Sequence, residues 1–190
     1  VVLRTQRPHG DQAGQRTKQR HTHDPLTNTR GAPPQIRRCR LAVRRRGGMM
    51  PPVQTGLALG SNLGDRLAHL RAGRDFLLAL HGGPRPPALS PVYETAPVGC
   101  PPGSPAFLNA VIEIETSLDP AALLARLAAF EQQLGRPARR ITNAPRLLDL
   151  DLLYAGDTIL DLPTLTVPHP RLAQRRFVLQ PLAAIRPQLI

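Results

Sequence analysis

The stretch from Leu148 to Leu153 constrains the fold of this chain more than any other feature. Leucine occupies positions 148, 150 and 152, and Asp149 and Asp151 stand between them. A period of two predicts a half-buried β-strand whose leucines face the core. The two aspartates would then lie on the opposite face, about 6–7 Å apart along the strand.

Two neighbouring carboxylates repel each other, and a bound cation removes that repulsion. Mg²⁺ is commonly bound by one or two carboxylates together with substrate phosphates. The alternative is a solvated outer strand face, because polar residues often simply face water. A Pro-Arg pair just before the strand and basic residues at positions 136, 139 and 140 favour the metal site.

The positive charge of the chain is concentrated at its start. Residues 1–48 hold 12 of the 25 lysines and arginines and only two acids, whereas residues 49–190 hold 13 arginines against 11 acids. The high net charge therefore does not identify the larger part as a nucleic-acid binder. Two cysteines are too few for a disulfide framework, so we expect a reducing compartment, the cytoplasm. No apolar run reaches the length of a membrane span.

Composition divides the chain into two parts. Residues 1–50 are rich in Arg, Gln, Pro and Gly and lack periodicity, so they are predicted to be a disordered basic extension. A nucleic-acid-binding arm or a targeting peptide is the alternative. Translation from Met49 or Met50 would make the upstream residues an artefact, and the sequence leaves this open. Residues 51–190 are predicted to form the folded domain.

The periodic segments of the folded part follow the order strand, helix, strand, strand, helix, strand. This order predicts a ferredoxin-like α+β sandwich (βαββαβ) with an antiparallel sheet. Asp119 and Pro120 are a typical helix start, and Pro181 is expected to break the last helix. The predicted strands are 56–62, 92–95, 107–116, a central strand 148–153, 158–160 and 165–167, and the predicted helices are 64–80, 120–134 and 177–185.

Four short motifs follow one another along the chain: Leu59-Gly60-Ser61-Asn62-Leu63-Gly64, Phe107-Leu108-Asn109-Ala110, Pro145-Arg146-x-Leu148-Asp149-Leu150-Asp151, and Val167-Pro168-His169-Pro170 with Arg175-x-Phe177. Each is weak alone. In this order, and on elements of the right type, they resemble the 6-hydroxymethyl-7,8-dihydropterin pyrophosphokinase family of folate synthesis. The resemblance covers about residues 57–189. It implies the ferredoxin-like fold, a pyrophosphokinase domain over 51–190, and transfer of pyrophosphate from ATP to the pterin hydroxymethyl group, leaving AMP.

The resemblance also implies roles for charged residues in that transfer. Asp149 and Asp151 match the pair that binds two Mg²⁺ ions, and two ions can clamp the attacking and leaving oxygens of an in-line displacement. Arg136 and Arg146 match residues that neutralise charge during the reaction. They complete the predicted catalytic set with the two aspartates.

The predicted nucleotide site contains three further residues. His169 and Arg175 match contacts to the ATP phosphates, and Glu131 matches the nucleotide side of the family site. In isolation, a histidine after a proline is more often a surface turn residue, and the basic segment 136–146 could be a solvated connection.

The predicted pterin site is flat and partly aromatic. Phe107 and Phe177 match two rings that sandwich the pterin, although each alone would more often be a core residue. Asn109 shares a strand face with Phe107 and offers both a donor and an acceptor. The complete predicted pterin set is Thr95, Pro97, Val98, Phe107, Asn109 and Phe177.

Three positions depart from the family pattern. Asn143 stands where the family usually has a tryptophan, Ala144 where glycine is common, and Ala138 where a second basic residue is expected. These departures affect the expected closure of the loop before the 148–153 strand, and not the aspartate pair.

Two other functions compete with this interpretation. One is a different two-metal, nucleotide-dependent transferase; the segment from Gly60 to Gly64 lacks the lysine of a P-loop, which excludes that class of NTPase. The other is an RNA-binding ferredoxin-like module, which the scarcity of aromatic residues argues against. We expect a monomer whose partners are ATP and the pterin, with no requirement for nucleic acid or membrane.

Overall fold

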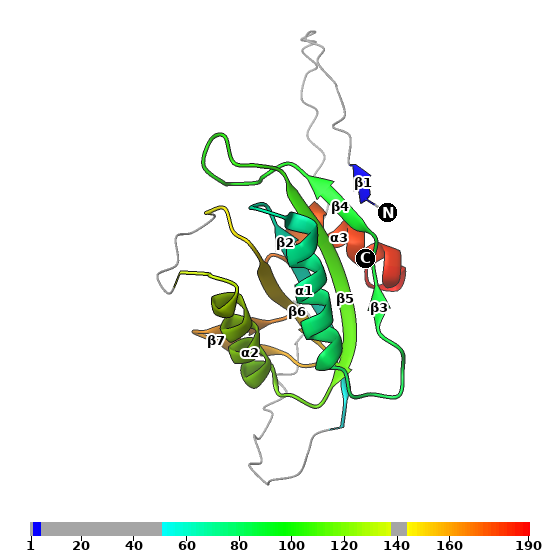
Figure 1. Cartoon of the computed structure of the whole chain (residues 1–190). Helices are drawn as coiled ribbons and strands as arrows, with labels where there is room; N and C mark the ends of the chain where they lie inside the picture. The colour runs from blue at the N-terminus through cyan, green and yellow to red at the C-terminus, as the bar shows by residue number, and fades with distance from the viewer. Residues whose placement is uncertain (1, 5–50, 138–143) are drawn as a thin grey trace, which may run out of the picture. The chain divides into compact units, whose positions relative to one another are not determined.

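The computed structural model describes residues 2–4, 51–137 and 144–190 of the chain. Two sets of predictions concern residues that the structure does not describe: the disorder of residues 5–50, and the departures at loop positions 138 and 143. The described part is an α+β structure with three α-helices and a largely antiparallel sheet, which agrees with the predicted class (Figure 1). None of its helices combines the length and the apolar character that a membrane crossing requires.

The main sheet has the strand order β1-β4-β5-β2-β6, and β3 also pairs with β5. A separate hairpin joins β7 to β8. Pairing is antiparallel throughout except between β1 and β4. The strands are β1 (Val2–Arg4), β2 (Val53–Ser61), β3 (Ala88–Leu89), β4 (Val92–Thr95), β5 (Phe107–Thr116), β6 (Asp149–Ala155), β7 (Leu160–Leu162) and β8 (Leu165–Val167).

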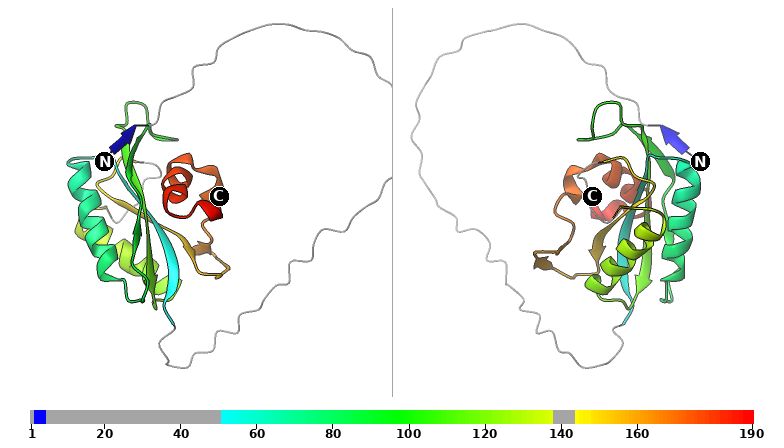
Figure 2. Two further views of the ribbon diagram at one scale, coloured as in Figure 1. Left: turned by 90° about the vertical axis from the view of Figure 1, so that its right-hand side faces the viewer. Right: turned by 60° about the vertical axis from the view of Figure 1, so that its left-hand side comes forward.

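Helices cover the two faces of the sheet unequally. The helices α1 (Arg66–Ala79) and α2 (Pro120–Gln133) lie side by side on one face, and the shorter α3 (Arg176–Ile185) lies on the other (Figure 2). The larger core forms beneath α1 and α2 and includes leucines of β2 and β6. A smaller core forms beneath α3 from Val111, Leu153, Val178 and Leu182. Because α3 is short, it leaves part of its face open.

Strand alternation explains both cores. Leu148, Leu150 and Leu152 are at most 4% exposed and belong to the larger core, as the sequence predicted. Each fully buried leucine contributes roughly 1.5–3 kcal/mol to folding. On β5, Leu108, Ile112 and Ile114 belong to the same larger core, and Val111 belongs to the smaller core beneath α3.

The predicted start of α2 is confirmed in detail. The Asp119 carboxylate accepts hydrogen bonds from the backbone N–H groups of Ala121 and Ala122, both at 3.0 Å, and Pro120 is the first helical residue. Such a cap satisfies two of the unpaired donors of the first turn and stabilises a helix by about 1 kcal/mol. The helix ends before Gly135, whose φ of 94° suits a residue without a side chain.

Several expectations differ from the structure. The strand carrying Asp149 is not central, because β6 is outermost among the described strands and β2 and β5 lie inside. Pro181 does not break α3: it removes one backbone hydrogen bond, but its burial with Val178 and Leu182 against the sheet offsets that loss. The strand predicted at 158–160 is β7, two residues further along.

The expected absence of regular structure in the first 50 residues is wrong for Val2–Arg4. These residues form β1 and pair with Val92, Tyr93 and Glu94 of β4. Without this strand, β4 would present unpaired backbone N–H and C=O groups along its outer side, and such groups readily accept another strand.

Candidate active site

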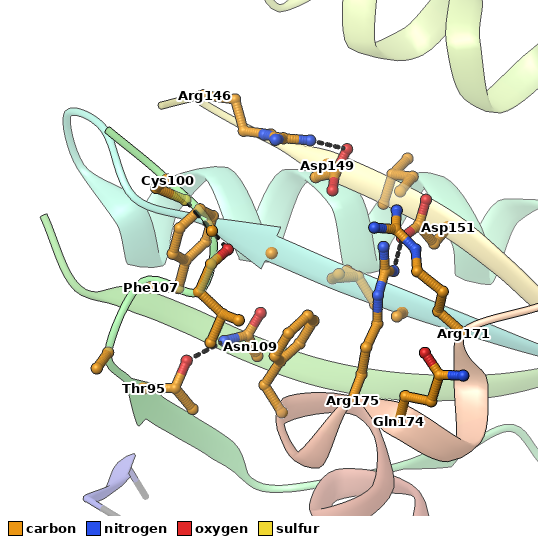
Figure 3. Close-up of a pocket in the computed structure, with 18 of the residues that line it drawn as sticks. Thr95, Cys100, Phe107, Asn109, Arg146, Asp149, Asp151, Arg171, Gln174 and Arg175 are labelled. Atoms are coloured by element: carbon orange, nitrogen blue, oxygen red, sulfur yellow. Dashed lines mark hydrogen bonds and ion pairs between the residues drawn. The ribbon is translucent and has the colours of Figure 1, made fainter. Parts of the chain in front are cut away.

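A cleft of about 510 Å³ opens on the part of the sheet that α3 leaves uncovered (Figure 3). Its floor is formed by β2 and β5 and one wall by β6. The other walls come from the 95–107 loop and from the segment that leads into α3. A volume of this size suits a small-molecule site.

The acidic wall is the predicted aspartate pair on β6. Both carboxylates are partly exposed, Asp149 at 25% and Asp151 at 34%. Asp149 Oδ1 lies 2.9 Å from the Arg146 guanidinium and 3.2 Å from that of Arg136, and Asp151 Oδ2 lies 2.8 Å from that of Arg175. Three arginines from separate segments therefore converge on two neighbouring acids.

Arg136 is positioned by the end of α2. Its backbone N–H donates to the Glu131 carbonyl at 3.0 Å, and its guanidinium forms ion pairs with the carboxylates of Glu131 and Asp149. Glu131 is buried, and its side chain accepts a hydrogen bond from the Leu150 N–H at 2.8 Å. Burial raises the pKa of Glu131, although the Leu150 hydrogen bond and the Arg136 charge oppose that shift.

The aspartate pair fits a hard divalent cation. Within the described residues, Asp149 Oδ2 and Asp151 Oδ1 form no hydrogen bond or ion pair, so each residue retains an oxygen for a ligand. The same residues contain no cluster of three or more His, Cys, Asp or Glu side chains. A cation here would therefore complete its coordination with oxygens from substrate or water, as Mg²⁺ commonly does.

The aromatic part of the cleft lies on the other side of Gly60. Phe107 begins β5 and Phe177 is in the first turn of α3, with the Arg175 guanidinium 5.6 Å from the Phe177 ring centroid. Between them, Asn109 Nδ2 donates to Thr95 Oγ1 at 2.7 Å. Within the described residues, Asn109 Oδ1 accepts no hydrogen bond, so the amide can still recognise a ligand edge.

Gly60 separates the two halves of the cleft. It pairs with Asn109 on one side and with Asp149 on the other. A Cβ atom at this position would lie 3.1 Å from Asn109 Oδ1 and 3.7 Å from the Phe107 ring. The absence of a side chain at Gly60 therefore leaves the floor open for a flat group.

Ten of the thirteen predicted site residues line the cleft, and three do not. Pro97 lies between two lining residues, and Glu131 is buried behind the acidic wall. His169 lies just outside the lining as well. The ten that line it are Thr95, Val98, Phe107, Asn109, Arg136, Arg146, Asp149, Asp151, Arg175 and Phe177.

His169 is fixed by its neighbours. Its backbone N–H donates to the Leu153 carbonyl at 2.8 Å, and its ring Nδ1 accepts the Arg171 N–H at 3.1 Å. Burial lowers the pKa of His169, and the charges of Arg175 and Arg171 add to the shift while Asp151 opposes it. The imidazole is therefore neutral near pH 7, with its proton on Nε2.

Sequence reasoning missed Arg171, Gln174 and Cys100, which also line the cleft. Arg171 precedes the short 3₁₀ turn η1 (Leu172–Gln174) and Gln174 is its last residue, and this segment shows no periodic pattern. Within the described residues, Arg171 has no ion pair, unlike Arg136, Arg146 and Arg175. Its place directly after Pro170, between the two parts of the fourth motif, is the signal that could have found it.

Fold and site together define an α+β protein with an arginine-rich, two-carboxylate cleft beside a flat aromatic slot. Such a cleft can bind a polyanion at one end and a planar ring at the other. The sequence profile described as "7,8-dihydro-6-hydroxymethylpterin-pyrophosphokinase (HPPK)" matches residues 56–187. The chain belongs to this family.

Individual relatives agree with the profile. The chain is 43% identical over 133 residues to the 2-amino-4-hydroxy-6-hydroxymethyldihydropteridine pyrophosphokinase of Pseudomonas aeruginosa, which covers 70% of this chain and 80% of the relative. The protein of the same name from Bacillus subtilis is also 43% identical, with 78% of its length covered. The folic acid synthesis protein fol1 of Schizosaccharomyces pombe is 38% identical over 134 residues, but these are only 18% of its length.

Proposed function

We propose that this chain transfers pyrophosphate from ATP to the hydroxymethyl group of 6-hydroxymethyl-7,8-dihydropterin, giving AMP and the pterin diphosphate for folate synthesis. The observation that carries the proposal is the pairing of an acidic, arginine-lined wall with an aromatic slot in one cleft of a chain of this family. Transfer of this kind requires mainly positioning and charge neutralisation, which such a cleft can provide.

In this proposal, Asp149 and Asp151 bind Mg²⁺ through the oxygens that the arginines leave open. Two bound ions would neutralise the charge of the ATP phosphates and orient the reacting oxygens. Arg136 and Arg146, both on Asp149, stabilise negative charge where the β-phosphorus is attacked. The bidentate capacity of each guanidinium allows it to remain on Asp149 while donating to a phosphate.

Arg175 and Arg171 are proposed to bind the remaining phosphate oxygens. Arg175 approaches from beside Asp151, and Arg171 lies next to it with no carboxylate partner among the described residues (Figure 3). An unpaired guanidinium is available to a phosphate without first breaking an ion pair. The ATP contacts predicted for His169 and Glu131, which do not line the cleft, remain predictions.

The pterin is proposed to lie between Phe107 and Phe177, above Gly60. Stacking between two rings favours a planar ligand by about 0.5–1.5 kcal/mol beyond the area that it buries. Asn109, oriented by Thr95, would recognise the amide edge of the pterin through its open Oδ1. Val98 is 70% exposed on the rim and would contact the ligand from the loop, together with Pro97.

Finer features of the fold and of the state of the chain belong to the same proposal. The order β4-β5-β2-β6, with α1 and α2 on one face, supports a ferredoxin-like βαββαβ topology. Residues 51–190 are proposed to be the pyrophosphokinase domain. We also propose that the chain acts as a monomer and needs no nucleic acid, since the partners expected for this family are ATP and the pterin. A cytoplasmic location remains a prediction based on the low cysteine content.

The proposal is tested by incubating the purified chain with ATP, Mg²⁺ and hydroxymethyl-dihydropterin and separating the nucleotides. We expect AMP in a 1:1 ratio to the pterin diphosphate, dependence on both substrates, and loss of turnover with EDTA. Release of ADP would indicate a kinase that transfers a single phosphoryl group and would overturn the proposal. Replacing ATP with pre-formed AMP plus pyrophosphate provides the background control.

A further inference from the structure

Asn62 immediately follows β2, and its buried carboxamide connects two segments that form opposite walls of the cleft. Its Oδ1 accepts a hydrogen bond from the Arg146 N–H at 2.8 Å, and its Nδ2 donates to the Pro105 carbonyl at 3.3 Å. The side chain belongs to a residue that is only 1% exposed. Arg146 leads into β6, and Pro105 leads into β5 two residues before Phe107.

The connection to Arg146 is double. Besides the side-chain contact, the Asn62 N–H donates to the Arg146 carbonyl at 3.2 Å. Both backbone polar groups of Arg146 are therefore bound to Asn62. From this fixed backbone, the guanidinium reaches the Ala144 carbonyl at 3.1 Å and Asp149 Oδ1 at 2.9 Å. The direction of the Arg146 side chain is thus determined at both ends.

The opposite wall is bound at two consecutive carbonyls. Asn62 binds Pro105, and the Arg66 guanidinium donates to the next carbonyl, that of Ala106, at 2.8 Å. Arg66 is itself paired with Glu94 of β4 at 3.1 Å. The chain therefore enters β5 in a fixed direction, which sets the position of the Phe107 ring.

Asparagine is suited to this position because one planar group provides both an acceptor and donors. The Arg146 N–H requires an oxygen, and the Pro105 carbonyl requires an N–H, so a single orientation of the amide satisfies both. An aspartate would keep the acceptor but lose the donor. A leucine of similar size would lose both and leave two buried backbone groups without partners.

We propose that Asn62 is a positioning residue that sets the spacing between the Arg146 guanidinium and the Phe107 ring. This inference rests on the proposed function, in which Arg146 acts on the phosphates and Phe107 on the pterin. The inference gives Asn62 a function within the Gly60-Ser61-Asn62 motif, in which Gly60 keeps the floor of the cleft open. Asn62 contacts neither substrate and acts through the two residues that do.

Steady-state kinetics separate the two connections. Asn62→Leu should lower kcat about 10- to 100-fold, because a displacement of about 1 Å can have that effect on a reacting group. Asn62→Asp keeps the acceptor for Arg146, so it should lose less kcat while the KM for the pterin rises. If Asn62→Leu does not fold, Asn62→Asp still decides: an unchanged pterin KM would overturn the inference.

Thr55→Val is the matched control. Thr55 is on β2, the strand that Asn62 follows, is equally buried, and makes one side-chain hydrogen bond, to the Val53 carbonyl at 3.1 Å. Its loss should lower the melting temperature while kcat and KM stay within about twofold of wild type, as expected for an isolated change remote from the cleft. A fall in kcat in Thr55→Val equal to that in Asn62→Leu would show that lost stability alone explains the effect.

A double-mutant cycle tests whether Asn62 acts through Arg146. In an Arg146→Ala background, Asn62→Leu should change kcat less than about threefold, because coupled residues do not contribute additively. An equal loss of kcat in both backgrounds would contradict the proposed positioning.

Amide hydrogen exchange tests the geometry without any turnover. The Arg146 amide should exchange at least about tenfold faster in Asn62→Leu and at the wild-type rate in Thr55→Val, because protection depends on the acceptor. An unchanged rate in Asn62→Leu would overturn the inference. A wild-type chain that makes no AMP would refute the proposed function and leave this measurement valid.

Discussion

Two carboxylate–arginine clusters lie on the same face of the sheet, and they differ in what their oxygens have left to bind. Glu113 of β5 accepts hydrogen bonds from Arg186, Gln54 and Tyr154, the last at 2.5 Å, so both of its oxygens are occupied. Asp149 and Asp151 each have only one occupied oxygen among the described residues. The first cluster is saturated, and the second is open.

Burial follows the same division. The Glu113 side chain is 6% exposed, against 25% for Asp149. Although burial raises it, the hydrogen bonds from Arg186 and Tyr154 keep the pKa of Glu113 below its ordinary value, and burial with Glu113 nearby raises the pKa of Tyr154. A saturated carboxylate stabilises the contact of β5 with the end of α3, whereas an open one keeps capacity for a ligand.

The largest expected difference concerns catalysis. Replacing both Asp149 and Asp151 by Asn preserves shape and removes the charges that would bind metal, so kcat/KM should fall by at least about 10³-fold, or roughly 4 kcal/mol. The melting temperature should change little, because these side chains are partly exposed. Assay of AMP formation together with thermal unfolding checks both. Turnover near the wild-type rate would contradict the assignment of the metal site.

In the saturated cluster around Glu113, we expect the opposite result: lost stability with retained turnover. Glu113→Gln leaves the Arg186 charge without its partner, which should lower the free energy of unfolding by about 2 kcal/mol, below the range for fully buried pairs because Arg186 is partly exposed. Turnover at a temperature where the variant is folded should stay near wild type. Urea titration and AMP assay measure the two quantities. A Glu113→Gln variant with normal stability but without turnover would show that Glu113 serves the reaction and not the fold.

Replacing a glycine of β2 by alanine adds one methyl group, at Gly56 beside the saturated cluster and at Gly60 beside the open one. A Cβ at Gly56 would overlap the ring of Tyr154, and one at Gly60 would lie 3.1 Å from Asn109 Oδ1. Gly56→Ala should therefore cost about 1–3 kcal/mol of stability by overpacking, with normal KM values. Gly60→Ala should mainly raise the pterin KM, by about tenfold for 1.4 kcal/mol of lost binding.

Measuring the melting temperature and the KM for both variants decides between these outcomes. A Gly60→Ala protein with unchanged pterin KM would show that the ring does not lie above this residue. A Gly56→Ala protein with a raised KM would show that the two clusters are not independent.

The smallest effect concerns pH. Because the pKa of folded Glu113 lies below its ordinary value of 4.5, its ionised form stabilises the fold above pH 4.5, and this contribution is lost as the pH falls through the lower, folded value. The stability difference between wild type and Glu113→Gln should therefore shrink in acid. Urea titrations on both sides of pH 4.5 measure it. A stability difference that grows in acid would show that folding raises the pKa of Glu113 and does not lower it.

The sequence predicted those parts of the fold and site that depend on local pattern. The alternation around Asp149 placed the leucines in the core and the acids on the other face, and the same period placed Phe107 with Asn109. Asp119 and Pro120 marked the start of α2. In each case the signal is carried by neighbouring residues, so it does not depend on the rest of the fold.

What the sequence did not predict depends on contacts between distant segments. Nothing near Glu113 indicates that Arg186, 73 residues later, would bind it. The outer position of β6 follows from the order of strand pairing, which a single strand does not encode. Arg171 is in the cleft because the segment after His169 turns back over the sheet, and no periodic pattern accompanies that turn.

The outer position of β6 also affects how the protein behaves when concentrated. The Leu150 N–H binds the carboxylate of Glu131, a residue of α2, instead of another strand. An outer strand with unsatisfied N–H groups attracts strands of other molecules, and a buried charge beside it opposes such association. Glu131 therefore limits growth of the sheet at this position. This contribution would appear in solubility and in resistance to aggregation, apart from the role of Glu131 in holding Arg136.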